Sequence, residues 1–251
     1  MTMNHTEASP TRKARIAGVL YLIVIVTAGF AEAFARGKLV VPGDAAATAN
    51  NILTHEMLYR AGGAADLVNF VCDVALALLF YQLLRPVSRS FALPMAAFRM
   101  MGDGLGAFIT FLHFGVLVLL TNAPYLIVFS PAQVQAQALM LLRLHSQGYN
   151  VAMVFFGVHC VLLGYLIYRS RFWPRFVGVV LSISGLCYLF NSFARFLAPA
   201  FAARLSPYIL LPGVLAEASV MVMLLVGVKE DVWFERAGVP RSERMQTATS
   251  R

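Results

Sequence analysis

Apolar and polar positions follow one another along this chain in long blocks. Apolar runs of about 20 residues recur six times, and a helix of that length rises about 30 Å, enough to cross the hydrocarbon layer of a membrane. The period-two alternation that is typical of barrel strands is absent from these runs. We therefore predict an all-α, polytopic helical membrane bundle with six transmembrane helices, at 15–35, 58–84, 91–121, 149–169, 175–197 and 208–229.

The segments between these spans predict short outer interfacial helices. Asp44 follows a Pro-Gly turn and can cap an Ala-rich stretch at 45–56. A Ser-Pro pair at 130–131 provides an N-cap and a first-turn proline for a second outer helix. We expect that helix to end at Gly148, where the chain turns into the fourth span.

Composition and charge agree with a membrane protein. Hydrophobic residues make up 59% of the chain and charged residues 13%, against about 45–50% and about 25% in soluble domains. The net charge is +8, and many of the basic residues lie in or beside the loops at 86–90 and 170–174 and in two polar tails, 1–14 and 230–251. Because they do not form one basic patch, no nucleic-acid partner is indicated. By the positive-inside rule both tails are cytoplasmic and flank one domain, 15–229, in the lipid bilayer of the cell membrane.

Signatures of metal or nucleophilic chemistry are missing from the sequence. The three cysteines, Cys72, Cys160 and Cys187, lie inside predicted spans without C-x-x-C spacing, which argues against a disulfide framework or a zinc site. The chain has no H-x-x-x-H, H-E-x-x-H or Gly-x-Ser-x-Gly pattern, and no phosphate loop or dinucleotide fingerprint. We expect no metal and no cofactor, and an enzyme is the least favoured class.

Five ionisable residues fall at a similar depth when 1.5 Å per residue is counted from the basic loops, at about 15–21 Å. They are Asp73, Arg99, Asp103, His159 and Glu217. Arg99 and Asp103 are four residues apart on one helix and can pair directly. Because charged groups within a membrane are costly and usually functional, we interpret these five as a candidate polar site.

A second polar layer lies farther from the basic loops. Asp66 and Arg195 are both at about 28–30 Å by the same count. Asn191 shares a helix face with Arg195, so we predict a pair between Asp66 and Arg195 that links the second and fifth spans. His113 and His145 are close to this depth as well.

Several short motifs are shared with a known family. They are Val41-Pro-Gly-Asp44, Cys72-Asp-Val-Ala-Leu-Ala77, Ala97-Phe-Arg99, Phe156-Gly-Val-His-Cys160 and Gly164-Tyr-Leu-Ile-Tyr-Arg169. Together they resemble a bacterial family of membrane proteins catalogued as domain of unknown function 4386, from about Arg15 to Lys229. The resemblance implies a six-span integral membrane protein, and it brings no activity, substrate or cofactor.

Three functions from different classes fit these patterns. The favoured one is a transporter or channel for a small solute or a proton, which requires a water-accessible cavity that reaches Asp73 or Arg99. The alternative is a structural or regulatory membrane protein, whose buried charges only fix which helices meet. The third is an intramembrane enzyme that acts on lipid.

Overall fold

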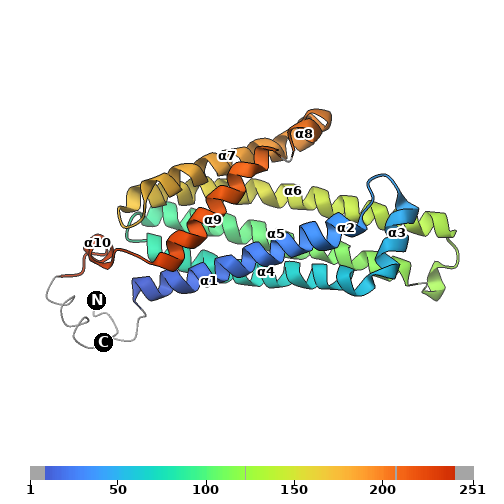
Figure 1. Ribbon diagram of the computed structural model, residues 1–251, viewed down its shortest axis with the longest axis horizontal. Helices are drawn as coiled ribbons and strands as arrows, with labels where there is room; N and C mark the ends of the chain where they lie inside the picture. Colours follow the sequence, from blue (N-terminus) through green and yellow to red (C-terminus); the bar gives the residue numbers. More distant parts are fainter. Residues whose placement is uncertain (1–8, 122, 207, 241–251) are drawn as a thin grey trace. The chain divides into compact units, whose positions relative to one another are not determined.

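The computed structural model describes residues 9–121, 123–206 and 208–240 (Figure 1). Within these ranges every regular element is a helix, which confirms the all-α prediction. Residues 1–8 and 241–251 of the two predicted tails lie outside the described residues.

Among the described residues, six helices are long and apolar enough to cross a membrane, by their length and composition. The prediction of six spans is therefore confirmed, and the chain is a multi-pass membrane protein. The first span joins α1 (Pro10–Gly29), a π-helical segment (Phe30–Arg36) and α2 (Gly37–Leu39); the others are α4 (Glu56–Leu84), α5 (Arg89–Leu120), α6 (Pro131–Ser170), α7 (Arg175–Leu197) and α9 (Leu211–Val226), the last preceded by a 3-10 turn (Tyr208–Leu210). The short elements are α3 (Ala45–Thr54), a 3-10 turn (Pro124–Leu126), α8 (Pro199–Leu205) and α10 (Glu230–Arg236).

Two helix starts follow directly from the predicted caps. The carboxylate of Asp44 accepts a hydrogen bond from the Ala47 amide at 2.8 Å, and α3 begins at the next residue, Ala45. At the start of α6, the Ser130 amide donates to the Gln133 side chain at 2.8 Å, and the Gln133 amide donates to the Ser130 hydroxyl at 3.3 Å. This reciprocal pair confirms the helix start at Pro131.

The predicted turn at Gly148 is wrong. Helix α6 runs unbroken for 40 residues from Pro131 to Ser170, about 60 Å at 1.5 Å per residue, with Gly148 inside it. A single glycine costs a helix only about 1 kcal/mol, which packing can outweigh. A Cβ atom at Gly148 would lie 2.7 Å from the side chain of Ile109, so this glycine is a contact point between α6 and α5.

The chain divides into two compact units, and each is described by itself. Unit 1 comprises Met1–Leu22, Val74–Met100 and Met153–Arg251, and unit 2 comprises Ile23–Asp73 and Met101–Ala152. Helices α1, α4, α5 and α6 each contribute one part to each unit, whereas α7, α8, α9 and α10 belong to unit 1 and α3 belongs to unit 2.

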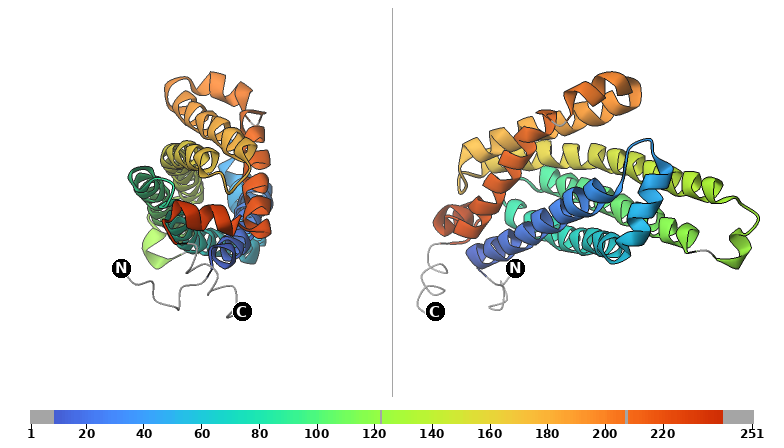
Figure 2. Two further views of the ribbon diagram at one scale, coloured as in Figure 1. Left: turned by 90° about the vertical axis from the view of Figure 1, so that its left-hand side faces the viewer. Right: turned by 45° about the vertical axis from the view of Figure 1, so that its right-hand side comes forward.

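In unit 1, α6 and α7 touch through their backbones. A Cβ atom at Gly164 would lie 2.5 Å from the Gly178 carbonyl oxygen, and one at Gly185 would lie 2.7 Å from the Gly157 carbonyl oxygen. Small residues of this kind allow close helix approach inside a membrane. In Figures 1 and 2, α9 runs back along α7 toward the end of the unit where α1 begins.

The same end of unit 1 is fastened by the segment 227–236. The Trp173 indole donates to the Gly227 carbonyl, and the Trp233 indole donates to the Leu83 carbonyl, both at 2.9 Å. The Arg236 guanidinium donates to the Arg169 carbonyl at 3.2 Å. Leu83 and Arg169 lie in the last turns of α4 and α6, where carbonyl oxygens lack helical donors, so this segment caps two helices.

Candidate functional site

A buried arginine lies at the centre of the polar residues of unit 1. Arg99, on α5, is 1% exposed, and its Nη1 lies 2.8 Å from Nε2 of His159 on α6. His159 is 0% exposed, and its Nδ1 lies 2.8 Å from the Met95 carbonyl oxygen. Because a carbonyl oxygen only accepts, Nδ1 carries the hydrogen and Nε2 accepts from Arg99. The contacts therefore select a neutral imidazole with one defined tautomer.

Three aromatic rings surround the same guanidinium. Its central carbon lies 5.5 Å from the ring centroid of Tyr21, 5.8 Å from that of Phe80 and 5.4 Å from that of Phe156. Aromatic faces attract cations, and the attraction is stronger where water is excluded. The contacts of Arg99 within unit 1 thus include a hydrogen bond to an imidazole and three rings, from α1, α4 and α6.

Glu217 forms a second polar contact in unit 1. The Tyr188 hydroxyl, on α7, donates to the Glu217 carboxylate, on α9, at 2.5 Å. Tyr188 is buried, and its ring centroid lies 5.5 Å from that of Phe156, the ring that also contacts Arg99. Gly213, one turn before Glu217, leaves the space that the Tyr188 hydroxyl occupies. Phe156 therefore joins the Arg99 and Glu217 contacts into one group.

In unit 2, the main polar contact is an ion pair. Arg36 Nη1 lies 2.5 Å from one oxygen of Asp66, and Nη2 lies 3.2 Å from the other. Arg36 Nε also donates to Glu32, one turn earlier, at 2.9 Å. The bidentate geometry is the strong form of an Arg–carboxylate pair. Arg36 and Glu32 lie in the π-helical segment, a rare conformation that often occurs at functional sites.

A reciprocal contact joins α4 to α5 in unit 2. The Tyr59 hydroxyl donates to the His113 carbonyl, and His113 Nε2 donates to the Tyr59 carbonyl, both at 2.9 Å. The two rings stack with centroids 3.9 Å apart and planes 6° apart. The His145 ring lies 6.0 Å from that of His113. Such a contact fixes the register of the two helices.

The structure brings together part of the predicted polar site. Arg99 and His159 are in direct contact, and Glu217 reaches them through Tyr188 and Phe156. Asp73 and Asp103 belong to unit 2, where each is 5% exposed. Their membership of one site with Arg99 stays a prediction.

The predicted outer pair requires a correction. Both oxygens of Asp66 bond to Arg36, whereas Arg195 donates to the Ser206 hydroxyl at 3.2 Å. Among the described residues, Asn191 Oδ1 has no hydrogen-bond partner. The predicted first span ended at residue 35 and left Arg36 outside it, but the first helical run continues to Leu39 and includes Arg36. Depth along a helix also leaves open which helices are neighbours.

Sequence reasoning missed the aromatic residues around Arg99 and the tyrosine on Glu217. Tyr21, Phe80, Phe156 and Tyr188 are common residues of apolar spans and show no charge pattern. The available signal is the spacing of Tyr188 and Asn191, which puts two polar groups on one face of the fifth span. Within the described ranges, no group of three or more His, Cys, Asp or Glu residues could hold a metal ion.

Comparison with known proteins gives a family without an assigned activity. The family described as "Domain of unknown function (DUF4386)" matches residues 16–227. An uncharacterized protein from Archaeoglobus fulgidus is 28% identical over 127 residues, which cover 50% of this chain and 62% of that protein. The match thus spans less than two thirds of that relative's length. No solved structure matches the chain.

Proposed function

The chain belongs to the family Domain of unknown function (DUF4386), and on that premise we propose that it moves a proton or a small solute across the cytoplasmic membrane. The observation that carries the proposal is the burial of Arg99 and His159 inside helices that are long and apolar enough to cross a membrane. By insertion scales a charged residue at the centre of a membrane helix costs about 2.5–3.5 kcal/mol, and such residues commonly serve transport.

Helix packing alone does not require this arginine. The close α6–α7 contact of the same unit is made at glycines, such as Gly164 and Gly178. Small residues provide close helix contact at a lower cost than a guanidinium. The presence of a buried arginine in this unit therefore supports a role beyond helix association.

The Glu217–Tyr188 contact and the Arg99–His159 contact of unit 1 suit different steps of transport. Glu217 is half-buried, and the Tyr188 hydroxyl beside it can pass a proton to or from the carboxylate. Deeper in the unit, Arg99 provides a fixed positive charge that would attract an anion or repel a cation. We propose Glu217 as the residue through which a proton or solute enters and Asp73 as a further carrier residue.

Transport requires a second conformation. The sequence led us to expect a water-accessible cavity at Asp73 or Arg99, but these residues are 5% and 1% exposed, so the described conformation is closed around them. For transport, helix movement would have to expose these residues to one side of the membrane at a time. We propose that both chain ends face the cytoplasm, because the basic residues gather in alternate loops and at the ends.

The test is proton flux into vesicles that contain the purified full chain and an internal pH-sensitive dye. Under an imposed potential, the wild type should acidify the vesicles faster than protein-free vesicles do. Glu217→Gln and Asp73→Asn should each slow the flux by at least about tenfold, which corresponds to about 1.4 kcal/mol on the barrier. Glu56→Gln is the matched control, because Glu56 is an acid on the same helix as Asp73 and pairs with Arg60 at the start of α4.

Two outcomes would count against the proposal. Full flux in both Glu217→Gln and Asp73→Asn would remove these residues from the pathway. If vesicles with the wild-type protein show the same flux as protein-free vesicles, for protons and for a panel of small labelled solutes, the protein is not a transporter of these species. The alternative of a structural or regulatory role would then be favoured. That alternative is favoured by one observation, namely that the guanidinium of Arg99 is enclosed by an imidazole and three rings.

A further inference from the structure

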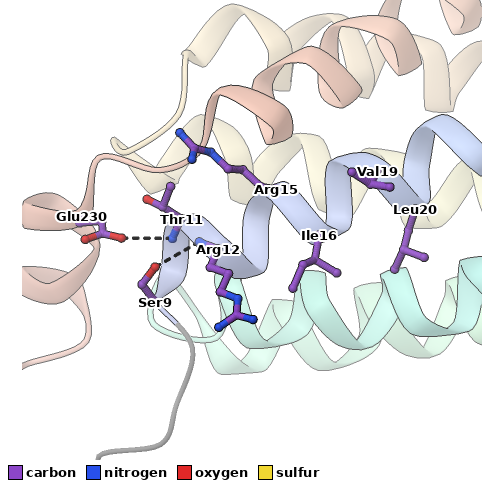
Figure 3. Close-up of a pocket in the computed structure, with 8 residues that line it drawn as sticks. All are labelled: Ser9, Thr11, Arg12, Arg15, Ile16, Val19, Leu20 and Glu230. Atoms are coloured by element: carbon purple, nitrogen blue, oxygen red, sulfur yellow. Dashed lines mark hydrogen bonds between the residues drawn. The ribbon is translucent and has the colours of Figure 1, made fainter. Parts of the chain in front are cut away.

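The start of α1 forms one wall of a cavity of about 580 Å³ (Figure 3). The cavity belongs wholly to unit 1 and is lined by residues from the first three turns of α1 and by Glu230 of α10. Its volume lies in the range of about 300–1,000 Å³ that is usual for small-molecule sites. The residues that line the cavity do not include Arg99, His159 or Glu217, so it is a different site from the Arg99 group.

The lining residues change from basic to aliphatic along the helix. Figure 3 shows Arg12, Ile16 and Leu20 pointing to one side of α1, and Arg15 and Val19 pointing to the other side in that view. Each arginine is therefore followed, one turn later, by an aliphatic side chain. Both arginines, Ile16 and Val19 are exposed. A ligand in this cavity would meet cations at one end and apolar surface at the other.

The polar backbone at the mouth of the cavity is already bonded within the chain. The Thr11 amide donates to the Glu230 carboxylate at 3.3 Å, and the Thr11 hydroxyl donates to the Val228 carbonyl at 3.2 Å. The Arg12 amide donates to the Ser9 hydroxyl at 3.2 Å. These bonds use the first amides of α1, so the guanidinium groups are the cationic donors offered to a ligand. The lining holds two guanidinium groups and one carboxylate, which leaves it with an excess of positive charge.

We propose that this cavity binds the headgroup of an anionic phospholipid that has a phosphodiester and no amine. The guanidinium groups of Arg12 and Arg15 would hold the phosphate, and the first part of an acyl chain would lie along Ile16 and Val19. Guanidinium geometry suits phosphate oxygens. A free soluble anion would make no favourable contact with the aliphatic half of the cavity, whereas an acyl chain would. The position also fits, because α1 begins the first membrane span and its start lies where headgroups are found. This site goes beyond the proposed transport and does not depend on it.

The experiment measures lipid bound to the full chain in detergent. The protein is incubated with equal amounts of phosphatidylglycerol, phosphatidylcholine and phosphatidylethanolamine, and bound lipids are counted by native mass spectrometry. The wild type should retain phosphatidylglycerol in preference to the other two. Arg12→Gln and Arg15→Gln should each weaken its retention by about fivefold, with the double variant weaker still, as expected for a loss of about one basic contact each.

Matched controls separate this site from general surface charge. Arg85→Gln and Arg89→Gln remove two exposed arginines at the end of α4 and the start of α5 in unit 1, and should leave the lipid preference unchanged. Ile16→Ser should weaken lipid retention, because it removes apolar surface from the acyl end. Elution volume on size exclusion checks that each variant is folded.

Several results would overturn the proposal. They include equal retention of phosphatidylglycerol and phosphatidylcholine by the wild type, and wild-type retention by the Arg12→Gln/Arg15→Gln variant. Displacement of the lipid by inorganic phosphate at the same concentration would identify a free anion as the ligand instead. A preference for phosphatidylethanolamine that Glu230→Gln abolishes would identify an amine-bearing lipid, bound through the carboxylate.

Discussion

Unit 2 holds a partly buried arginine, Arg36, and unit 1 holds a fully buried one, Arg99, and their contacts differ. In unit 2, Arg36 binds both oxygens of Asp66 and also reaches Glu32. In unit 1, Arg99 donates to a neutral His159 and is surrounded by aromatic rings. The side chain of Arg36 is 13% exposed and that of Glu32 is 77% exposed, whereas Arg99 is 1% exposed.

The difference shows how access to water changes what a buried cation needs. A guanidinium that keeps some contact with water loses less hydration, so a carboxylate partner compensates it well. At Arg99, where water is excluded, the contacts with the ring faces and with His159, which is itself fixed by the Met95 carbonyl, are strengthened. We therefore expect substitutions in unit 1 to be more costly than matched substitutions in unit 2.

The largest effect is expected for Arg99→Met. This change leaves Nε2 of His159 without its donor and removes a cation from among three rings, so we expect a loss of about 3–5 kcal/mol in the free energy of unfolding. The measurement is SDS-induced unfolding in mixed micelles. Arg89→Met, an exposed arginine on the same helix, is the control and should change stability by less than about 0.5 kcal/mol. Equal effects of the two variants would contradict the special role of Arg99.

A smaller effect is expected for Arg36→Met in unit 2. It leaves the Asp66 carboxylate buried without its partner, at a cost of about 2–3 kcal/mol. Adding Asp66→Leu removes the isolated charge, so the double variant should recover at least half of that loss in the same unfolding assay. If the double variant is no more stable than Arg36→Met alone, the pair is not the source of the stability.

The smallest effect is expected for glycine substitutions, which compare how closely helices pack within each unit. A Cβ atom at Gly164 in unit 1 meets the backbone of Gly178, whereas one at Gly106 in unit 2 meets the ring of Phe70, which can rotate. We expect Gly164→Ala to cost about 1–3 kcal/mol and Gly106→Ala clearly less, measured by the same titration. Gly104→Ala is the control, because a Cβ atom there meets nothing within 4 Å and should be neutral or slightly stabilising. A Gly106→Ala variant that is less stable than Gly164→Ala would reverse the comparison.

Local signals in the sequence were sufficient for the helices and for some of their ends. The Asp44 cap and the Ser-Pro start at 130–131 depend only on residues within one turn, and both predictions are confirmed. The prediction of a turn at Gly148 was wrong because it, too, used only local signals. A glycine between a polar and an apolar stretch is typical of a turn, but here its lack of a side chain serves the contact with Ile109 on another helix.

The candidate site could be predicted only in part. The depth count put Arg99 and His159 at the same level, and the two side chains are in contact. It did not find the partner of Asp66, because Arg36 lies just beyond the predicted end of the first span at residue 35. Aromatic partners such as Phe156 gave no signal, because an aromatic ring in an apolar span looks the same whether it faces lipid or a guanidinium.

The sequence by itself determined that this chain is a six-span helical membrane protein, because the length and polarity of each apolar run are local properties that the membrane selects directly. The tertiary structure alone decided which polar groups meet. Whether Arg36 finds Asp66, or Tyr188 finds Glu217, depends on the rotation of each helix about its axis and on which helices are neighbours. These choices follow from the packing of side chains far apart in the sequence, which no single span contains.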